Sequence, residues 1–185
     1  MSNNKKFYIG IDLGTTNSTV SVVNIDKDGK IVPKTLEVEQ LDDYGLGFTY
    51  DAIVPSALYV DDNGDKNVGR YAIKMLDTYP KRVLKEAKRH IGVLRNGKPA
   101  SWNIDEEIFT PEVVSSYVLK KLKKEAEKYL QQEVDSVVIT VPANFNFNQV
   151  GATRTAAKFA GFDPDKIYTL AEPTAALIDY LNEER

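Results

Sequence analysis

The stretch Tyr8-Ile-Gly-Ile-Asp-Leu-Gly-Thr-Thr-Asn17 decides how the rest of this sequence is interpreted. Its first half is apolar and predicts a buried strand, which places Asp12 at the strand end. A hydroxyl-rich turn follows, in which Gly14 lets the backbone approach a ligand closely because it has no Cβ. The turn's amides and the hydroxyls of Thr15 and Thr16 can form an anion-binding concavity, beside which Asp12 can meet a hydrated divalent cation. An ordinary Gly-Thr hairpin explains the same residues equally well.

Strands are predicted near residues 7–13 and 18–25, on either side of this turn, and they would form a hairpin. Residues 137–141 are continuously apolar, which is expected for a central strand that is covered on both faces. Residues 167–170 predict a further short strand. The chain therefore offers several strands for one sheet, with longer polar and helical segments between them.

Helix signals occur at several places along the chain. Thr110 followed by Pro111 predicts a helix start, with a threonine cap and a proline in the first turn. Asn146 with Gln149 resembles a capping box for a second long helix. Shorter helices are predicted near residues 69–77 and 81–91. Together with the strands, these signals predict an α/β fold.

Several charged or glycine-containing stretches have a simple structural explanation. Lys88 is one lysine among many on the predicted helix 81–91, and the residues alone predict a solvated side chain. The lysines at 120, 121, 123 and 124 predict a solvated helix face in preference to an RNA-binding patch. The segment 92–98 follows most of a P-loop pattern, but Pro99 stands where a Ser or Thr would bind magnesium, so we expect a turn.

The composition narrows the class of protein. The 185 residues suffice for one domain or two small lobes, and a net charge of -3 argues against a nucleic-acid or anionic-membrane partner. There is no cysteine, so neither a disulfide framework nor a cysteine-based zinc site is expected. His90 is the only histidine, which leaves little material for a Ser-His-Asp triad. Without a long apolar run, the sequence predicts a soluble, cytoplasmic protein with no signal peptide.

Two further stretches occur in the order, and nearly at the spacing, of one known family. They are Val137-Val-Ile-Thr-Val-Pro-Ala143 and Ala171-Glu-Pro-Thr-Ala-Ala176. Together with the turn after Asp12, they resemble the heat-shock protein 70 (DnaK-type) chaperones of the actin-like ATPase superfamily. The resemblance covers essentially the whole chain but only the first half of that family's nucleotide-binding domain. A second lobe and a peptide-binding domain are therefore expected to lie outside this chain.

The resemblance implies an α/β fold of a particular kind. It is an actin-like ATPase (ribonuclease H-like) lobe, in which a mixed sheet with flanking helices carries a small inserted α/β subdomain. The core subdomain would comprise residues 1–39 and 111–185, and the inserted subdomain residues 40–110. Asn17 stands where animal cytosolic members have an aromatic residue, so the resemblance is to a divergent bacterial member.

The resemblance also assigns roles to individual residues. Asp12 and Glu172 would hold magnesium through water molecules, and the turn Gly14-Thr15-Thr16-Asn17 would cradle the phosphates. Lys88 would stabilise the attacking water and the developing phosphoryl charge, with Glu172 placing that water. Arg89 would reach toward the edge of the adenine. Without the resemblance, Glu172 before a proline is better explained as an ordinary helix cap than as a catalytic group.

The chain departs from the family near Pro142, which matches a proline that links the nucleotide cleft to the interdomain surface. The family usually has Tyr, Asp and Arg where this chain has Asn144, Phe147 and Val150. In the family that arginine works with the proline to report the nucleotide state. The resemblance therefore leaves open whether ATP and peptide binding remain coupled.

The function that the resemblance implies is ATP binding and hydrolysis in a chaperone that binds and releases unfolded polypeptides. The expected cofactors are ATP or ADP, Mg²⁺ and K⁺, and the expected partners include a J-domain co-chaperone and a nucleotide exchange factor. This lobe alone is expected to bind nucleotide weakly, with negligible turnover. A non-catalytic binding or scaffolding module, a filament former and a sugar kinase of the same fold remain alternatives.

Overall fold

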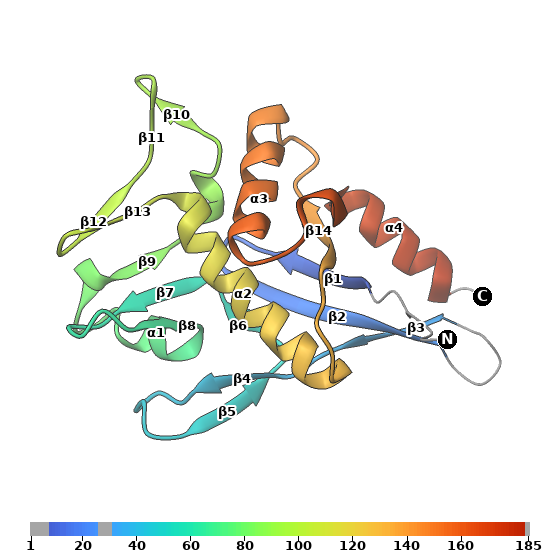
Figure 1. Cartoon of the computed structure of the whole chain (residues 1–185), viewed down its shortest axis with the longest axis horizontal. Coiled ribbons are helices and arrows are strands. Elements are labelled where there is room, and N and C mark those ends of the chain that lie inside the picture. Colours follow the sequence, from blue (N-terminus) through green and yellow to red (C-terminus); the bar gives the residue numbers. More distant parts are fainter. Residues whose placement is uncertain (1–7, 26–30, 184–185) are drawn as a thin grey trace.

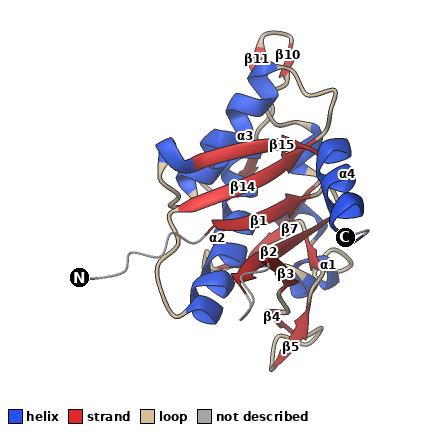
Figure 2. Ribbon diagram, turned by 90° about the vertical axis from the view of Figure 1, so that its right-hand side faces the viewer, coloured by secondary structure: helices blue, strands red, loops and turns tan. Residues whose placement is uncertain are grey.

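A computed structural model of the chain describes residues 8–25 and 31–183. The parts of the predicted strands and subdomains that fall on residues 1–7, 26–30 and 184–185 lie outside it. A twisted sheet occupies the middle of the molecule, with helices on both sides (Figures 1 and 2). No helix among the described residues is long and apolar enough to cross a membrane.

The central sheet has the strand order β15-β14-β1-β2-β3, with the short β6 paired to β2. The strands are β1 Tyr8–Leu13, β2 Asn17–Ile25, β3 Ile31–Thr35, β6 Val54–Pro55, β14 Ser136–Val141 and β15 Ile167–Ala171. β1, β14 and β15 run parallel, whereas β2 is antiparallel to β1 and to β3. The sheet is therefore mixed, which confirms the predicted fold class.

Three helices flank this sheet: α2 Pro111–Leu130, α3 Phe147–Phe159 and α4 Glu172–Glu183. In Figure 2, α2 and α3 lie on one side of the sheet and α4 on the other. The Thr110 side chain accepts a hydrogen bond from the amide of Val113, as predicted for a helix cap. Asn146 and Gln149 form a reciprocal capping box at the start of α3, which is also as predicted.

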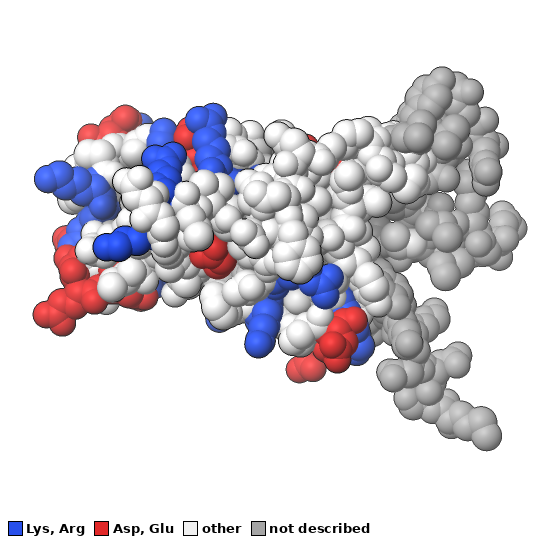
Figure 3. Space-filling view, turned by 90° about the horizontal axis from the view of Figure 1, so that it is seen from above, with Lys and Arg blue, Asp and Glu red and all other residues white. Residues whose placement is uncertain are grey.

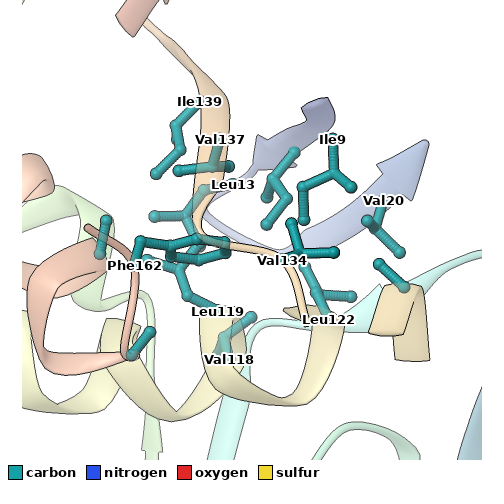
Figure 4. Close-up of a cluster of buried hydrophobic side chains, with 14 of the residues drawn as sticks. Ile9, Leu13, Val20, Val118, Leu119, Leu122, Val134, Val137, Ile139 and Phe162 are labelled. Atoms are coloured by element: carbon teal, nitrogen blue, oxygen red, sulfur yellow. The ribbon is translucent and has the colours of Figure 1, made fainter. Parts of the chain in front are cut away.

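The main hydrophobic core lies between the sheet and the helices α2 and α3. Strand residues such as Ile9 and Ile139 meet Leu119 and Leu122 of α2 (Figure 4), and all four are fully buried. Burying each such side chain contributes about 1.5–3 kcal/mol to folding. This packing fixes the sheet against α2, so the strand ends are held in defined positions.

The segment between β3 and α2 folds into small sheets. Its strands are β4 Val38–Leu41, β5 Phe48–Asp51, β7 Ala57–Val60, β8 Lys66–Val68, β9 Val83–Lys85, β10 Leu94–Arg95, β11 Lys98–Pro99, β12 Trp102–Ile104 and β13 Glu107–Phe109. One sheet has the order β8-β7-β9, and the other strands form three hairpins. A second cluster of buried residues, including Leu58, Leu84 and Phe109, packs this segment against the first turns of α2. The subdomain boundaries at residues 39/40 and 110/111 stay a prediction.

The prediction of a helix over residues 81–91 is wrong. The chain instead forms a 3-10 turn (Pro80–Arg82), the strand β9 and a second 3-10 turn (Ala87–Arg89). Glu86 adopts a left-handed conformation, with φ of 58°, which an α-helix cannot contain. Pairing of β9 with β7 thus overrides the helical pattern.

Two other local predictions have different outcomes. The helix predicted near residues 69–77 is shorter in the structure, where α1 covers Arg70–Lys74. The P-loop lookalike is a turn, as predicted, because β10 and β11 form a hairpin across Asn96 and Gly97. Both turn residues have positive φ, 52° and 76°, which is typical of a tight hairpin.

Charged side chains of both signs are mixed on the molecular surface. On the face drawn in Figure 3, blue and red side chains lie side by side, and a largely uncharged area separates the charged regions. This distribution agrees with the small net charge of -3.

Candidate functional site

The carboxyl ends of three parallel strands meet at one edge of the central sheet. β1 brings Asp12 there, β14 brings Thr140, and β15 leads directly into Glu172 at the start of α4. The Thr140 hydroxyl donates a hydrogen bond of 2.6 Å to the exposed carboxylate of Asp12. Ligand sites of open α/β sheets commonly form outside the carboxyl ends of such strands. Sequence reasoning missed Thr140, although its place at the end of an apolar run was a usable signal.

In the turn between β1 and β2, position 14 has no room for any residue larger than glycine. A Cβ on Gly14 would lie 2.0 Å from the carbonyl oxygen of Asn17, which is far inside van der Waals contact. The amide of Gly14 donates to the Ser18 hydroxyl at 3.2 Å, and that hydroxyl lies 2.8 Å from the Ser56 hydroxyl. The Ser56 amide in turn donates to the carbonyl of Thr16 at 2.8 Å. These contacts hold the turn from beneath and leave Thr16 and Asn17 exposed.

Lys88 reaches the same edge of the sheet from a distant part of the chain. Lys88 is only 8 % exposed, and its Nζ donates a hydrogen bond of 2.7 Å to Oε1 of Glu172, which is 84 residues away in the sequence. The ammonium also lies 5.9 Å from the centre of the Phe145 ring. The prediction from the residues alone, that the Lys88 side chain is solvated, is therefore wrong. The cause is the 3-10 turn 87–89, which directs Lys88 inward where a regular helix was expected.

A small pocket lies between the β1–β2 turn and the 3-10 turn that carries Lys88. Leu13, Gly14 and Ser56 line it from the β1–β2 side, and Ala87 and Lys88 line it from the opposite side. The structure thus brings together Gly14 of the predicted turn, Lys88 and, through its ion pair, Glu172. Ser18 and Ser56, which support the turn, were not predicted as part of the site.

Two other predicted residues lie at the margins of this arrangement. Arg89 is exposed, and its guanidinium pairs with Glu86 at 3.2 Å. Pro142 directly follows β14 and is half-buried, and its carbonyl accepts a hydrogen bond of 3.1 Å from the amide of Phe145. Of the departures, Asn144 is exposed in the connection to α3, and Phe147 is the exposed first residue of that helix.

The donor set at the sheet edge suits a hydrated cation better than a direct protein cage. No group of three or more His, Cys, Asp or Glu residues is placed to hold a metal ion anywhere in residues 8–25 and 31–183. Magnesium is usually bound by one or two carboxylates, retained waters and substrate phosphates. An exposed Asp12 beside a glycine turn, with the Glu172 carboxylate nearby in the fold, fits that mode of binding.

Comparison with known proteins supports one family. The family described as Hsp70 protein matches residues 8–184. The chain is 37% identical over 180 residues to the chaperone protein DnaK of Thermosipho africanus, and 35% identical to that of Thermotoga neapolitana. Each match covers 97% of this chain and 27% of the relative, so the chain spans about a quarter of the length of these proteins. From the match and the geometry together, this chain belongs to the Hsp70 family.

Proposed function

We propose that this chain is the phosphate-binding lobe of an ATPase that drives a molecular chaperone. The observation that carries the proposal is the Lys88–Glu172 ion pair at 2.7 Å, which lies beside the Gly14 turn and the end of β1. A buried lysine, two carboxylates and a tight glycine turn are the groups that phosphoryl transfer needs. That chemistry depends on positioning and on charge neutralisation more than on covalent catalysis.

Asp12 and the turn Gly14-Thr15-Thr16-Asn17 would bind the phosphate chain of ATP and its Mg²⁺. Asp12 would hold the ion through a water molecule, and Thr140 would keep the carboxylate oriented through its hydrogen bond. The amides and hydroxyls of the turn would donate to phosphate oxygens. The ion itself supplies charge neutralisation on the phosphates when it is bound.

Lys88 and Glu172 would place the water molecule that attacks the γ-phosphorus. In hydrolysis, a bond forms between the water oxygen and phosphorus while the bond to the ADP oxygen breaks. The Lys88 ammonium would stabilise the charge on the transferred group, and the Glu172 carboxylate would accept a hydrogen bond from the water. Removal of such a group typically lowers kcat by about 10²–10³-fold. Arg89 would reach toward the edge of the adenine.

The remaining parts of the proposal concern the whole chaperone. Residues 1–39 and 111–185 would form the core subdomain and residues 40–110 an inserted one. Pro142 would link the site to binding and release of unfolded polypeptides, with a J-domain co-chaperone and a nucleotide exchange factor as cytoplasmic partners and K⁺ as a second ion. The Hsp70 match does not favour a sugar kinase or a scaffolding module.

The test is ATP turnover by the complete product of the gene, with Mg²⁺ and K⁺, beside the Lys88→Ala variant. We expect slow turnover that an unfolded peptide stimulates and that falls at least about a hundredfold in the variant. Turnover without stimulation would mean that the Pro142 region no longer couples the two activities. Equal turnover in both proteins would refute the assigned role of Lys88.

The 185-residue chain provides a second measurement. Isothermal titration with ATP and Mg²⁺ should give weak binding, because the lobe contacts the phosphates from one side only. Gly14→Ala should abolish that binding. Tight binding by the isolated chain would contradict the proposed division of the site between two lobes.

A further inference from the structure

A groove on the other side of α2 has no role in the site described above. It runs between α2, the edge strand β8 and the loop end of the β4–β5 hairpin, and in Figure 1 both β8 and this hairpin lie below α2. The residues that define this lysine groove are Phe48, Lys66, Tyr117, Lys120, Lys121 and Lys124. No carboxylate lines it. It is therefore a local concentration of positive charge in a chain whose net charge is -3.

The lysines of the groove differ from the other lysines of α2 in their partners. Lys123 pairs with Glu127, and Lys128 pairs with Glu39 and Glu125. Within residues 8–25 and 31–183, Lys120, Lys121 and Lys124 make no ion pair. Three adjacent ammonium groups therefore lack a counter-charge in contact, and like charges so close together repel one another.

The pKa of Lys121 also reflects the lack of a counter-charge in contact. Burial lowers the pKa of the Lys121 ammonium below its ordinary value, and this effect exceeds the opposing attraction of Glu125 and Glu39. Burial destabilises the charged form of this lysine, and no carboxylate in contact offsets that cost. An anion bound beside it would therefore stabilise the ammonium. The groove is thus charged and poised to bind a negative group.

Apolar surface lies next to these charges. Phe48 of β5 is 65% exposed, and Tyr117 of α2, which also lines the groove, is half-buried. An aromatic ring left open to water beside unpaired lysines suits a ligand that carries both carboxylates and apolar side chains. Simple counterions would use the lysines but not Phe48.

The spacing of the lysines indicates the shape of the ligand. Lys120 and Lys124 are four residues apart on one face of α2, a rise of about 6 Å along the helix. In an extended polypeptide, side chains on one face recur every second residue, roughly 6.6 Å apart. Carboxylates at alternate positions of an extended segment therefore match the lysines along the groove.

We propose that the lysine groove binds an extended acidic polypeptide segment, with carboxylates at alternate positions facing Lys120 and Lys124 and an apolar side chain on Phe48. A nucleic acid fits less well because carboxylates flank the groove. Glu107 pairs with Lys66 at one end, and Glu39 and Glu125 lie near Lys121. A continuous phosphate backbone would pass these carboxylates, whereas a short acidic segment carries its charge only where the lysines are. This inference does not depend on the proposed ATPase activity.

The experiment uses the 185-residue chain and a fluorescent peptide of about eight residues, in which Glu alternates with Leu and whose extended length is roughly 26 Å. Fluorescence anisotropy measures binding to the wild type, to the double variant Lys120→Gln/Lys124→Gln and to Phe48→Ala. Lys158→Gln is the matched control, because Lys158 is an exposed lysine on α3 with no ion pair among the described residues. Circular dichroism confirms that every variant is folded.

We expect the peptide to bind, with affinity about tenfold weaker in the double variant, since two ion pairs are lost. Phe48→Ala should weaken binding severalfold, and Lys158→Gln should leave it unchanged. A peptide with Gln in place of Glu should not bind. The proposal is overturned if the acidic peptide fails to bind at millimolar concentration, if all variants bind alike, or if single-stranded oligonucleotides bind the groove and the peptide does not.

Discussion

The two sides of the candidate site are built in different ways. On one side, Asp12 and the Gly14 turn are held by neighbouring strands, through the pairing of β1 with β2 and β14 and through the serine hydroxyls beneath the turn. On the other side, Lys88 arrives from a 3-10 turn and is held by one ion pair to Glu172, 84 residues away. The first side is part of the sheet, whereas the second is a contact between two distant segments.

This difference predicts different failures. A change on the strand side should disturb the fold and the site together, because the same hydrogen bonds build both. A change in the Lys88–Glu172 contact should remove the chemistry and leave most of the fold intact. The experiments below separate these outcomes.

Gly14→Ala should have the largest effect on folding. The added Cβ would lie 2.0 Å from the Asn17 carbonyl oxygen, so the turn must open, which we expect to cost about 1–3 kcal/mol in the free energy of unfolding. Urea unfolding of the 185-residue chain measures this cost. Gly10→Ala, in the preceding strand β1, is the control, because nothing lies within 4 Å of a Cβ there. Equal stability of the two variants would show that the turn is not tightly held.

The strand side is also the part that the sequence predicts best. The apolar run before Asp12, the glycine turn and the capping box at Asn146 are local patterns, and their outcomes in the structure depend on neighbours in sequence. The position of Lys88 is not local. A helical pattern over residues 81–91 gave way to a strand pairing and a left-handed Glu86, so only a family resemblance could single out Lys88. The support from Thr140 and Ser56 likewise depends on strands that meet only in the folded chain.

The Lys88–Glu172 pair should respond asymmetrically to substitution. Glu172→Gln leaves the Lys88 ammonium buried without a carboxylate, and we expect a loss of about 1–2 kcal/mol in stability, since Glu172 itself is 45% exposed on its side chain. Lys88→Met removes the buried charge and should be nearly neutral. Thermal unfolding of both single variants and the double variant gives the coupling energy.

The exposed pair Arg89–Glu86 is the control for this cycle, because surface ion pairs contribute roughly 0–1 kcal/mol. Similar coupling energies for the two pairs would mean that the Lys88 contact is no more than a surface ion pair. A clearly larger value for Lys88–Glu172 would identify it as the contact that closes the second side of the site.

Thr140→Val sharpens the comparison within the strand side. The valine keeps the shape of the side chain but removes the hydroxyl that donates to Asp12 at 2.6 Å. We expect little change in stability, because the contact is exposed, but weaker Mg²⁺-dependent ATP binding by severalfold, about 1 kcal/mol. Titration with and without Mg²⁺ checks this, and Thr140→Ser should restore binding. If ATP binding weakened equally with and without Mg²⁺, Thr140 would not act by orienting Asp12.

The smallest effect should come from the opposite end of β14, away from the site. Asp135 precedes that strand, and its hydrogen bonds with Lys166 and then with Ser136 lower the pKa of its carboxyl below the ordinary value. The folded chain therefore holds the ionised form more firmly than the unfolded chain does, so this contribution is present above about pH 4 and is lost as the pH falls further. As the pH falls below about 4, the melting temperature of Asp135→Asn should decrease less steeply than that of the wild type. ATP binding at neutral pH should stay the same. Because Lys166 and Asp135 are largely exposed, the difference in slope should be small, and identical slopes would show that this ion pair does not contribute to stability in acid.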